Sequence, residues 1–92
     1  MKDESMMWTV YIVRCNDQTL YTGITNNLEA RIKAHNEGRG AKYTRGRGPV
    51  QIVWFQVGMI QSDAIKREIE IKKLSRIQKE DLIANKIPTK YL

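Results

Sequence analysis

Five side chains that could cleave a phosphodiester stand at separate positions along the chain. This reaction needs a group that takes a proton from water, a cation that holds the phosphate, and an acidic ligand for a metal ion. Two tyrosines, an arginine, a histidine and a glutamate supply these chemical types. Most proteins contain such residues somewhere, so their chemistry depends on whether the fold brings them together. They are Tyr11, Tyr21, Arg31, His35 and Glu68.

Six predicted elements must position these side chains, in the order β-β-α-β-α-α. Runs of β-branched and aromatic residues predict the strands, and polar caps followed by apolar residues three or four apart predict the helices. The third strand is almost continuously apolar, which is typical of a central strand. The expected fold class is α+β, a small three-stranded, mostly antiparallel sheet flanked by helices. The predicted strands are 8–13, 20–24 and 51–57, and the predicted helices begin at the caps Asn26, Ser62 and Ser75 and end near residues 38, 74 and 83.

The turn between the first two strands decides whether the tyrosines can meet. If residues 16–19 form a four-residue loop, Cys15 pairs with Leu20. Because side chains alternate between the faces of a strand, Tyr11 and Tyr21 then point to opposite sides. Both tyrosines can enter one site only if the loop holds an odd number of residues or a bulge shifts the register.

The other three candidates lie on predicted helices. Arg31 and His35 are four residues apart, so they share one face of their helix. Glu68 lies on the second long helix, where Ile65 and Ile69 are expected to face inward. An ordinary solvated face is the alternative for both helices, and an ion pair with the lysine four residues on is the alternative role of Glu68. Strand propensity alone would likewise explain both tyrosines.

A basic segment rich in glycine follows the first helix. Glycines let backbone amides approach phosphates, and Tyr43 could stack on a base. The whole chain has sixteen Lys and Arg against ten Asp and Glu, a net charge of +6 that favours a polyanionic partner. The alternative is a flexible, solvated loop. The cations expected to bind nucleic acid are Arg39, Lys42, Arg45 and Arg47.

Length and composition restrict the class of protein. Ninety-two residues predict one domain, 1–92, with a core over about 8–83 and short tails. A single cysteine, Cys15, allows neither an internal disulfide nor a zinc cluster. No apolar run approaches the length of a membrane span, and the N-terminus has no apolar signal-peptide region. A cytoplasmic protein without an organic cofactor is therefore expected.

The order and spacing of these residues resemble the signature of the GIY-YIG nucleases. In particular, the chain resembles a small stand-alone bacterial group of uncharacterised GIY-YIG proteins, which is similar in turn to the N-terminal nuclease domain of the excision-repair endonuclease. The first triplet lacks the glycine and the second has threonine for isoleucine, but both tyrosines are kept. The matching segments are TVY at 9–11, YTG at 21–23, LEAR at 28–31, HNEG at 35–38, GAKYTR at 40–45, AIKRE at 64–68 and KLSR at 73–76.

The resemblance implies a metal-dependent DNA endonuclease, active in repair or recombination. Tyr11 would activate the attacking water with support from His35, and Tyr21 would orient phosphate or water. Arg31 would bind the scissile phosphate, and Glu68 would hold one Mg²⁺ or Mn²⁺ ion. Two alternatives stay open: a nucleic-acid-binding module that cleaves weakly or not at all, and an accessory protein of a larger complex.

Overall fold

The central strand of the sheet is the one that carries Tyr11. In the computed structural model, which describes residues 6–85, three antiparallel strands form a sheet in the order β2-β1-β3. The predicted α+β class and the order β-β-α-β-α-α are confirmed. None of the described helices is long and apolar enough to cross a membrane. The elements are β1 (Trp8–Arg14), β2 (Leu20–Thr25), α1 (Leu28–Asn36), the 3₁₀ turn η2 (Lys42–Thr44), β3 (Gln51–Met59), α2 (Gln61–Lys72) and α3 (Arg76–Asn85).

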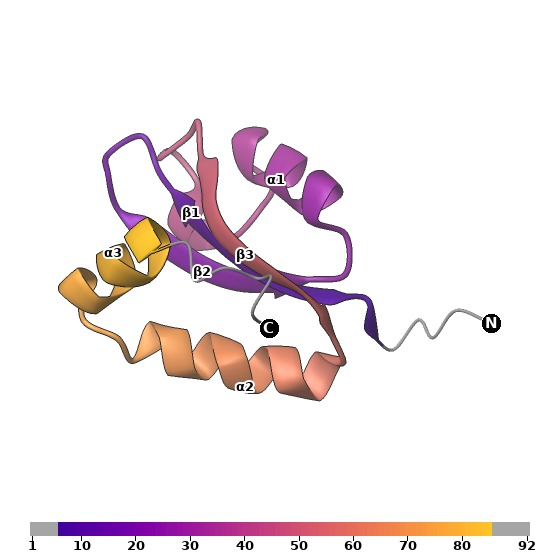
Figure 1. The fold of residues 1–92 in the computed structure, drawn as a ribbon. Coiled ribbons are helices and arrows are strands. Elements are labelled where there is room, and N and C mark those ends of the chain that lie inside the picture. The colour runs from indigo at the N-terminus through magenta and orange to yellow at the C-terminus, as the bar shows by residue number, and fades with distance from the viewer. Residues whose placement is uncertain (1–5, 86–92) are drawn as a thin grey trace.

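Helices cover the two faces of the sheet separately (Figure 1). Helix α1 lies on one face, and α2 and α3 lie on the other. Because side chains alternate along β1, this strand contributes to a core on each face. The core on the α2 side contains Val10, Ile12, Trp54, Ala64 and Ile71, and the core on the α1 side contains Tyr11, Val13, Cys15 and Val50.

The prediction that the third strand is central is wrong. Among the described residues β3 pairs only with β1, so it is an edge strand. Its Ile52, Phe55 and Val57 are exposed, whereas β1 is buried from residue 9 to residue 13. Continuous apolar character shows that a strand carries apolar side chains on both faces. Whether those side chains are covered depends on where the helices lie, and α2 packs mainly across β1 and β2.

The β1–β2 hairpin has a five-residue loop, 15–19, instead of a four-residue loop. The Gln18 N–H donates to the Cys15 carbonyl at 2.9 Å, which closes a turn, and Gln18 itself has φ 73°. A left-handed residue after such a turn adds one position to the loop. Arg14 therefore pairs with Leu20, and the pairing of Cys15 with Leu20 is wrong.

Helix α2 faces the sheet with different residues from those predicted. Ala64 and Ile71 are fully buried, whereas Ile65 and Ile69 are 40% and 47% exposed. Both sets have helical spacing, so periodicity could not choose between them. The observed rotation brings Glu68, which is four residues from Ala64 and three from Ile71, onto the half-buried side of the helix.

The helix caps also differ in part from the predicted ones. Asn27, not Asn26, accepts a hydrogen bond from the first turn of α1. Helix α2 begins one residue before Ser62 and has no side-chain cap. The capping box before α3 is confirmed: the Ser75 N–H donates to Gln78 Oε1 at 2.9 Å, and the Gln78 N–H donates to Ser75 Oγ at 3.1 Å.

Candidate active site

The five-residue loop places the two tyrosines on the same face of the hairpin. Tyr11 pairs with Gly23, and Tyr21 pairs with Val13, so an even number of residues separates their positions in the ladder. Their ring centroids are 6.4 Å apart and the ring planes are tilted by 50°. The odd loop length that a shared site requires is therefore present.

The absence of a side chain at Gly23 leaves room for the Tyr11 phenol. A Cβ atom on Gly23 would lie 2.6 Å from Tyr11 Oη and 2.8 Å from its Cζ. Real Cβ atoms do not come so close, so the ring can cross β2 only where the side chain is missing. Because β2 is an edge strand, this path leads the hydroxyl toward the edge of the sheet.

A chain of buried polar contacts leads from the phenol into the basic loop. Tyr11 Oη lies 2.8 Å from His35 Nε2, and His35 Nδ1 lies 2.7 Å from Thr44 Oγ1. The Thr44 hydroxyl donates to the Ala41 carbonyl at 3.0 Å. The three side chains are at most 1% exposed. We call Tyr11, His35 and Thr44 the buried relay.

Burial keeps both titratable members of the relay neutral. It raises the pKa of the Tyr11 phenol, and the positive charge of Arg31 only partly opposes this. Burial also lowers the pKa of His35, and repulsion by Arg31 lowers it further. At neutral pH the structure therefore holds an uncharged phenol against an uncharged imidazole.

Arg31 and Glu68 approach the phenol from helices on opposite faces of the sheet. Both act on the pKa of Tyr11, Arg31 lowering it and Glu68 raising it. Arg31 Nε is buried without a hydrogen-bond partner in the described part of the chain. A buried unpaired N–H of a cation is costly, and a phosphate oxygen would satisfy it. Arg31 is therefore suited to hold an anion beside Tyr11.

Glu68 is suited to hold a metal ion as a single carboxylate. Its side chain is 19% exposed and lies 3.3 Å from Lys72 Nζ, so the alternative ion pair is also present. Within residues 6–85 no group of three or more His, Cys, Asp or Glu could hold a metal together. Mg²⁺ commonly keeps several waters and binds one or two carboxylates plus phosphate oxygens, a set that one glutamate fits. Glu70 instead pairs with Arg67 at 3.1 Å.

Two of the four loop cations are engaged with acids. Arg39 pairs with Glu37, and Arg47 pairs with Asp17 of the hairpin loop. Lys42 and Arg45 are exposed, and neither forms an ion pair within residues 6–85. These two are therefore the cations most available to a phosphate backbone.

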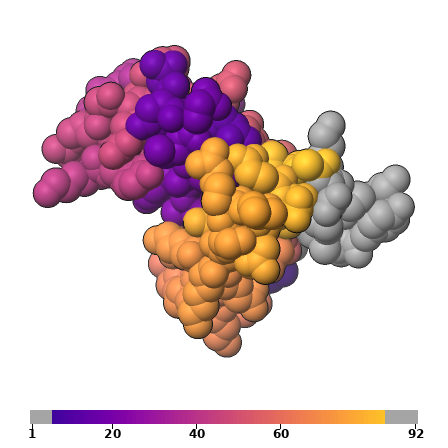
Figure 2. Space-filling view, turned by 90° about the vertical axis from the view of Figure 1, so that its left-hand side faces the viewer, coloured from indigo at the N-terminus to yellow at the C-terminus, as the bar shows by residue number. Residues whose placement is uncertain are grey.

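Tyr43 is stacked against the site in the folded chain. Its ring lies 5.8 Å from that of Tyr21 with 25° between the planes, and the Arg47 guanidinium lies 4.6 Å from its centroid. Tyr43 is still 44% exposed. Figure 2 shows the loop segment, in magenta and pink, beside the indigo hairpin. The Asn16 N–H ties the two together by donating to the Arg47 carbonyl at 2.7 Å.

The structure thus gathers Tyr11, Tyr21, Arg31 and His35 on the α1 side and brings Glu68 within electrostatic range of Tyr11. Thr44 was missed by sequence reasoning. A threonine in a basic loop has no periodic signal, and only its place in the segment GAKYTR, one of those on which the family resemblance rests, could have singled it out.

Comparison with known proteins gives a family match over most of the chain. Residues 7–81 match the family described as the GIY-YIG catalytic domain. A UPF0213 protein of Clostridium perfringens is 61% identical over 77 residues, which cover 84% of this chain and 83% of that protein. Another UPF0213 protein, from Oceanobacillus iheyensis, is 53% identical over 74 residues, covering 80% and 86%.

A solved structure is also similar. The solution NMR structure of a UPF0213 protein from Bacillus halodurans superposes with a TM-score of 0.57 at 46% identity, covering 86% of this chain and 84% of that one. The family match spans most of the chain, and the similar proteins are of comparable length. The chain therefore belongs to the GIY-YIG family, among its small stand-alone UPF0213 members.

Proposed function

We propose that this chain is a metal-dependent endonuclease that hydrolyses DNA and takes part in repair or recombination in the cytoplasm. Membership of the GIY-YIG family indicates a nuclease acting on nucleic acid with a divalent metal. The observation that carries the proposal furthest is the Tyr11 hydroxyl, held 2.8 Å from His35 Nε2 beside an arginine whose Nε lacks a partner among the described residues. DNA is favoured by the resemblance to the excision-repair nuclease domain.

Proton transfer through the buried relay activates the attacking water. The neutral imidazole of His35 accepts the phenolic proton at Nε2 as Tyr11 takes a proton from water. The resulting hydroxide forms the new bond to phosphorus, the bond from phosphorus to the leaving oxygen breaks, and the leaving oxygen takes up a proton from solvent. Because burial raises the pKa of the Tyr11 phenol, it keeps its proton at neutral pH and cannot act as a base alone; the histidine supplies the acceptor that makes this step possible.

Charge on the phosphate is balanced from both sides of the sheet. Arg31 donates to the scissile phosphate and gains the partner that its Nε lacks within residues 6–85. Glu68 holds the ion, and a bound divalent ion supplies Lewis-acid stabilisation of the developing negative charge. Tyr21 packs against both His35 and Tyr11, with centroids 5.4 Å and 6.4 Å away, and so restricts their orientation.

The nucleic acid binds along the basic loop. Lys42 and Arg45 can contact phosphates without breaking an ion pair, because both side chains are exposed and unpaired among the described residues. Arg39 and Arg47 contribute when phosphate competes with their present acidic partners. Tyr43 can offer a face to a base where the strand passes its exposed side.

Cleavage of a panel of branched, nicked and single-stranded DNA with Mg²⁺ or Mn²⁺ tests the proposal. Glu68→Gln should abolish metal-dependent cutting and leave DNA binding intact. Glu70→Gln, on the same helix and exposed, is the matched control and should cut normally. Undiminished cutting by Glu68→Gln would place the metal elsewhere. Absence of cutting by the unmodified protein, with salt-sensitive binding retained, would favour the binding module instead.

A further inference from the structure

The single hydroxyl proton of Thr44 determines how His35 carries its own proton. Thr44 Oγ1 contacts two groups, the Ala41 carbonyl at 3.0 Å and His35 Nδ1 at 2.7 Å. A carbonyl can only accept, so the hydroxyl donates to Ala41 and must accept from His35. Nδ1 therefore carries a hydrogen, and the lone pair of a neutral imidazole is left on Nε2. This is the only assignment that satisfies both contacts of the threonine.

The opposite tautomer would leave two acceptors, the Nδ1 lone pair and the Thr44 hydroxyl oxygen, facing each other. If Nε2 carried the hydrogen, it would donate to Tyr11 Oη, and Nδ1 would need a donor. Thr44 could supply one only by giving up its bond to the Ala41 carbonyl. The Ala41 carbonyl would then keep only the Thr44 N–H, at 3.1 Å, and because His35 and Thr44 are each 1% exposed, water cannot replace the lost hydroxyl bond.

We propose that Thr44 is a positioning residue of this site: it fixes His35 as the Nδ1–H tautomer and thereby presents the Nε2 lone pair to the Tyr11 hydroxyl. The consequence for cleavage rests on the proposed nuclease function. The tautomer itself is a property of the free protein and does not depend on that function.

The backbone of the basic loop is shaped for this contact. A Cβ atom on Gly40 would lie 2.3 Å from His35 Nδ1 and 2.8 Å from its Cα, so the loop passes directly over the histidine. The far end of the loop is tied back to α1, because the Val50 N–H donates to Asn36 Oδ1 at 2.7 Å. Thr44 therefore reaches His35 from a segment held at both ends.

The same segment carries the cations that are available to DNA. Lys42 is the first residue of the turn that holds Thr44, Arg45 follows its last residue, and both are exposed. One loop therefore has two roles. Its cations are exposed to the phosphate backbone, and its Thr44 orients the histidine that accepts the proton of Tyr11. Changes to Lys42 should alter DNA affinity, whereas changes to Thr44 should alter the chemical step.

Nitrogen NMR of the imidazole tests the tautomer directly. His35 is the only histidine in the chain, so protein labelled with ¹⁵N-histidine and free of a histidine tag gives one imidazole signal pair. The spectrum should be recorded about one pH unit above the ordinary histidine pKa of about 6.5. The unmodified protein should show Nδ1 protonated and Nε2 unprotonated.

Three variants test whether Thr44 or Tyr11 determines the tautomer of His35. Thr44→Ser keeps the hydroxyl and should keep the Nδ1–H tautomer, whereas the isosteric Thr44→Val should shift the population toward Nε2–H. Tyr11→Phe removes the other partner of the ring and should leave the tautomer unchanged. An Nε2–H tautomer in the unmodified protein, or a tautomer that changes in Tyr11→Phe but not in Thr44→Val, would overturn the proposal. If Thr44→Val does not fold, the unmodified protein and the other two variants still decide.

Single-turnover cleavage measures the consequence for the reaction. Thr44→Val should lower the rate of the chemical step on the order of 10²-fold with little change in DNA affinity, and Thr44→Ser should recover most of it. A residue with only a structural role would lower rate and affinity together, and that outcome would contradict the positioning role. If the unmodified protein does not cut DNA, the proposed function fails, while the tautomer measurement still tests the role of Thr44.

Discussion

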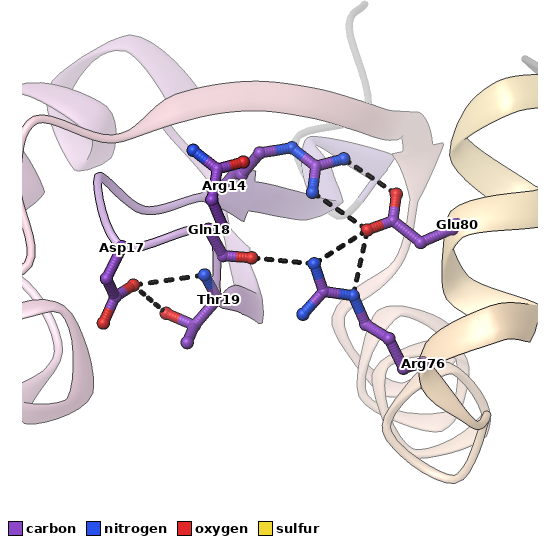
Figure 3. A network of polar contacts seen from close by, with 6 residues as sticks. All are labelled: Arg14, Asp17, Gln18, Thr19, Arg76 and Glu80. Carbon is purple, nitrogen blue, oxygen red and sulfur yellow. Dashed lines mark hydrogen bonds and ion pairs between the residues drawn. The ribbon is translucent and has the colours of Figure 1, made fainter.

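Two polar networks start from the same strand, β1, at Tyr11 and at Arg14, and are built in opposite ways. The buried relay lies on the α1 side, is uncharged and is at most 1% exposed. The other network lies at the hairpin (Figure 3), and its side chains are charged and 22% to 52% exposed. We call it the exposed clamp; it consists of Arg14, Arg76, Glu80 and the carbonyl of Gln18.

The exposed clamp fastens the last helix to the sheet. Arg14 donates two hydrogen bonds to the Glu80 carboxylate, at 2.9 Å and 2.8 Å. Arg76 donates to the same carboxylate and to the Gln18 carbonyl, at 2.9 Å and 2.8 Å. Figure 2 shows the result, with the indigo hairpin lying against the orange-to-yellow α2–α3 region.

The contrast shows where charge is useful in so small a domain. Charged groups in contact with water can join two elements without a large desolvation cost, but each pair contributes little to stability. A proton-transfer site needs neutral groups whose partners are fixed, so it is buried and almost fully hydrogen-bonded. Arg31 Nε is the exception at the site, and it is the atom that a phosphate would meet.

Displacing the relay without removing any of its groups should have the largest effect among the variants that compare the two networks. Gly23→Ala places a Cβ 2.6 Å from Tyr11 Oη and should lower the cleavage rate on the order of 10²-fold. Gly48→Ala is the matched control, because a Cβ there meets nothing closer than Asn36 Oδ1 at 3.9 Å. Single-turnover cleavage with Mg²⁺ measures both. Equal rates would mean that the phenol position is unimportant.

Breaking the relay should destabilise the fold more than breaking the clamp. His35→Phe leaves the Tyr11 hydroxyl buried without a partner and should cost about 1–3 kcal/mol. Glu80→Gln removes a carboxylate whose arginine partners can be solvated by water instead. The loss of stability should therefore be smaller and should decrease further in high salt. Urea unfolding at low and high salt measures both variants. The reverse order would show that the clamp holds the domain together.

Removing loop charge should weaken DNA binding while leaving the relay intact. Lys42→Gln with Arg45→Gln should reduce the slope of log affinity against log salt by about 1 for each phosphate that is no longer neutralised. Lys66→Gln removes the same kind of charge from the exposed side of α2 and is the matched control. Binding titrations at several salt concentrations test this. An equal change in slope for Lys66→Gln would place the DNA elsewhere.

The smallest expected effect is a difference between the pH ranges in which the two networks lose their contribution to stability. Hydrogen bonds from Arg14 are the main cause that lowers the pKa of Glu80 from 4.5 to about 2, so its contribution is present above about 4.5 and is lost as pH falls toward 2. The pKa of His35 is lowered from 6.5, so the unfolded chain takes up the proton first and stability falls as pH drops through this range.

Urea unfolding across a pH series resolves these two windows. His35→Phe should remove the loss of stability that begins near the ordinary histidine pKa of 6.5. Glu80→Gln should remove the part that begins near 4.5. A slope near 6.5 that persists without the only histidine would contradict the assignment to the relay.

Local patterns predicted the kinds and order of the elements, because propensity, caps and strand alternation act over a few residues. The shared face of Tyr11 and Tyr21 could be predicted only as a condition on the hairpin loop, since the left-handed residue there is Gln18 rather than glycine. The rotation of α2 was not predictable from Ile65 and Ile69, because the residues that are buried, Ala64 and Ile71, also have helical spacing. Thr44 acts through a contact nine residues away, which no periodicity reports.

The central claim is that the phenol of Tyr11 activates the attacking water, and Tyr11→Phe tests it most directly. The variant removes one oxygen and keeps the ring that packs in the α1-side core. Single-turnover cleavage should fall by about 10²- to 10⁴-fold with DNA binding nearly unchanged. The free energy of unfolding should fall by about 1–3 kcal/mol, because His35 Nε2 is left buried without its partner. Cleavage by Tyr11→Phe as fast as by the unmodified protein would contradict the account, since another group would then have to take the proton.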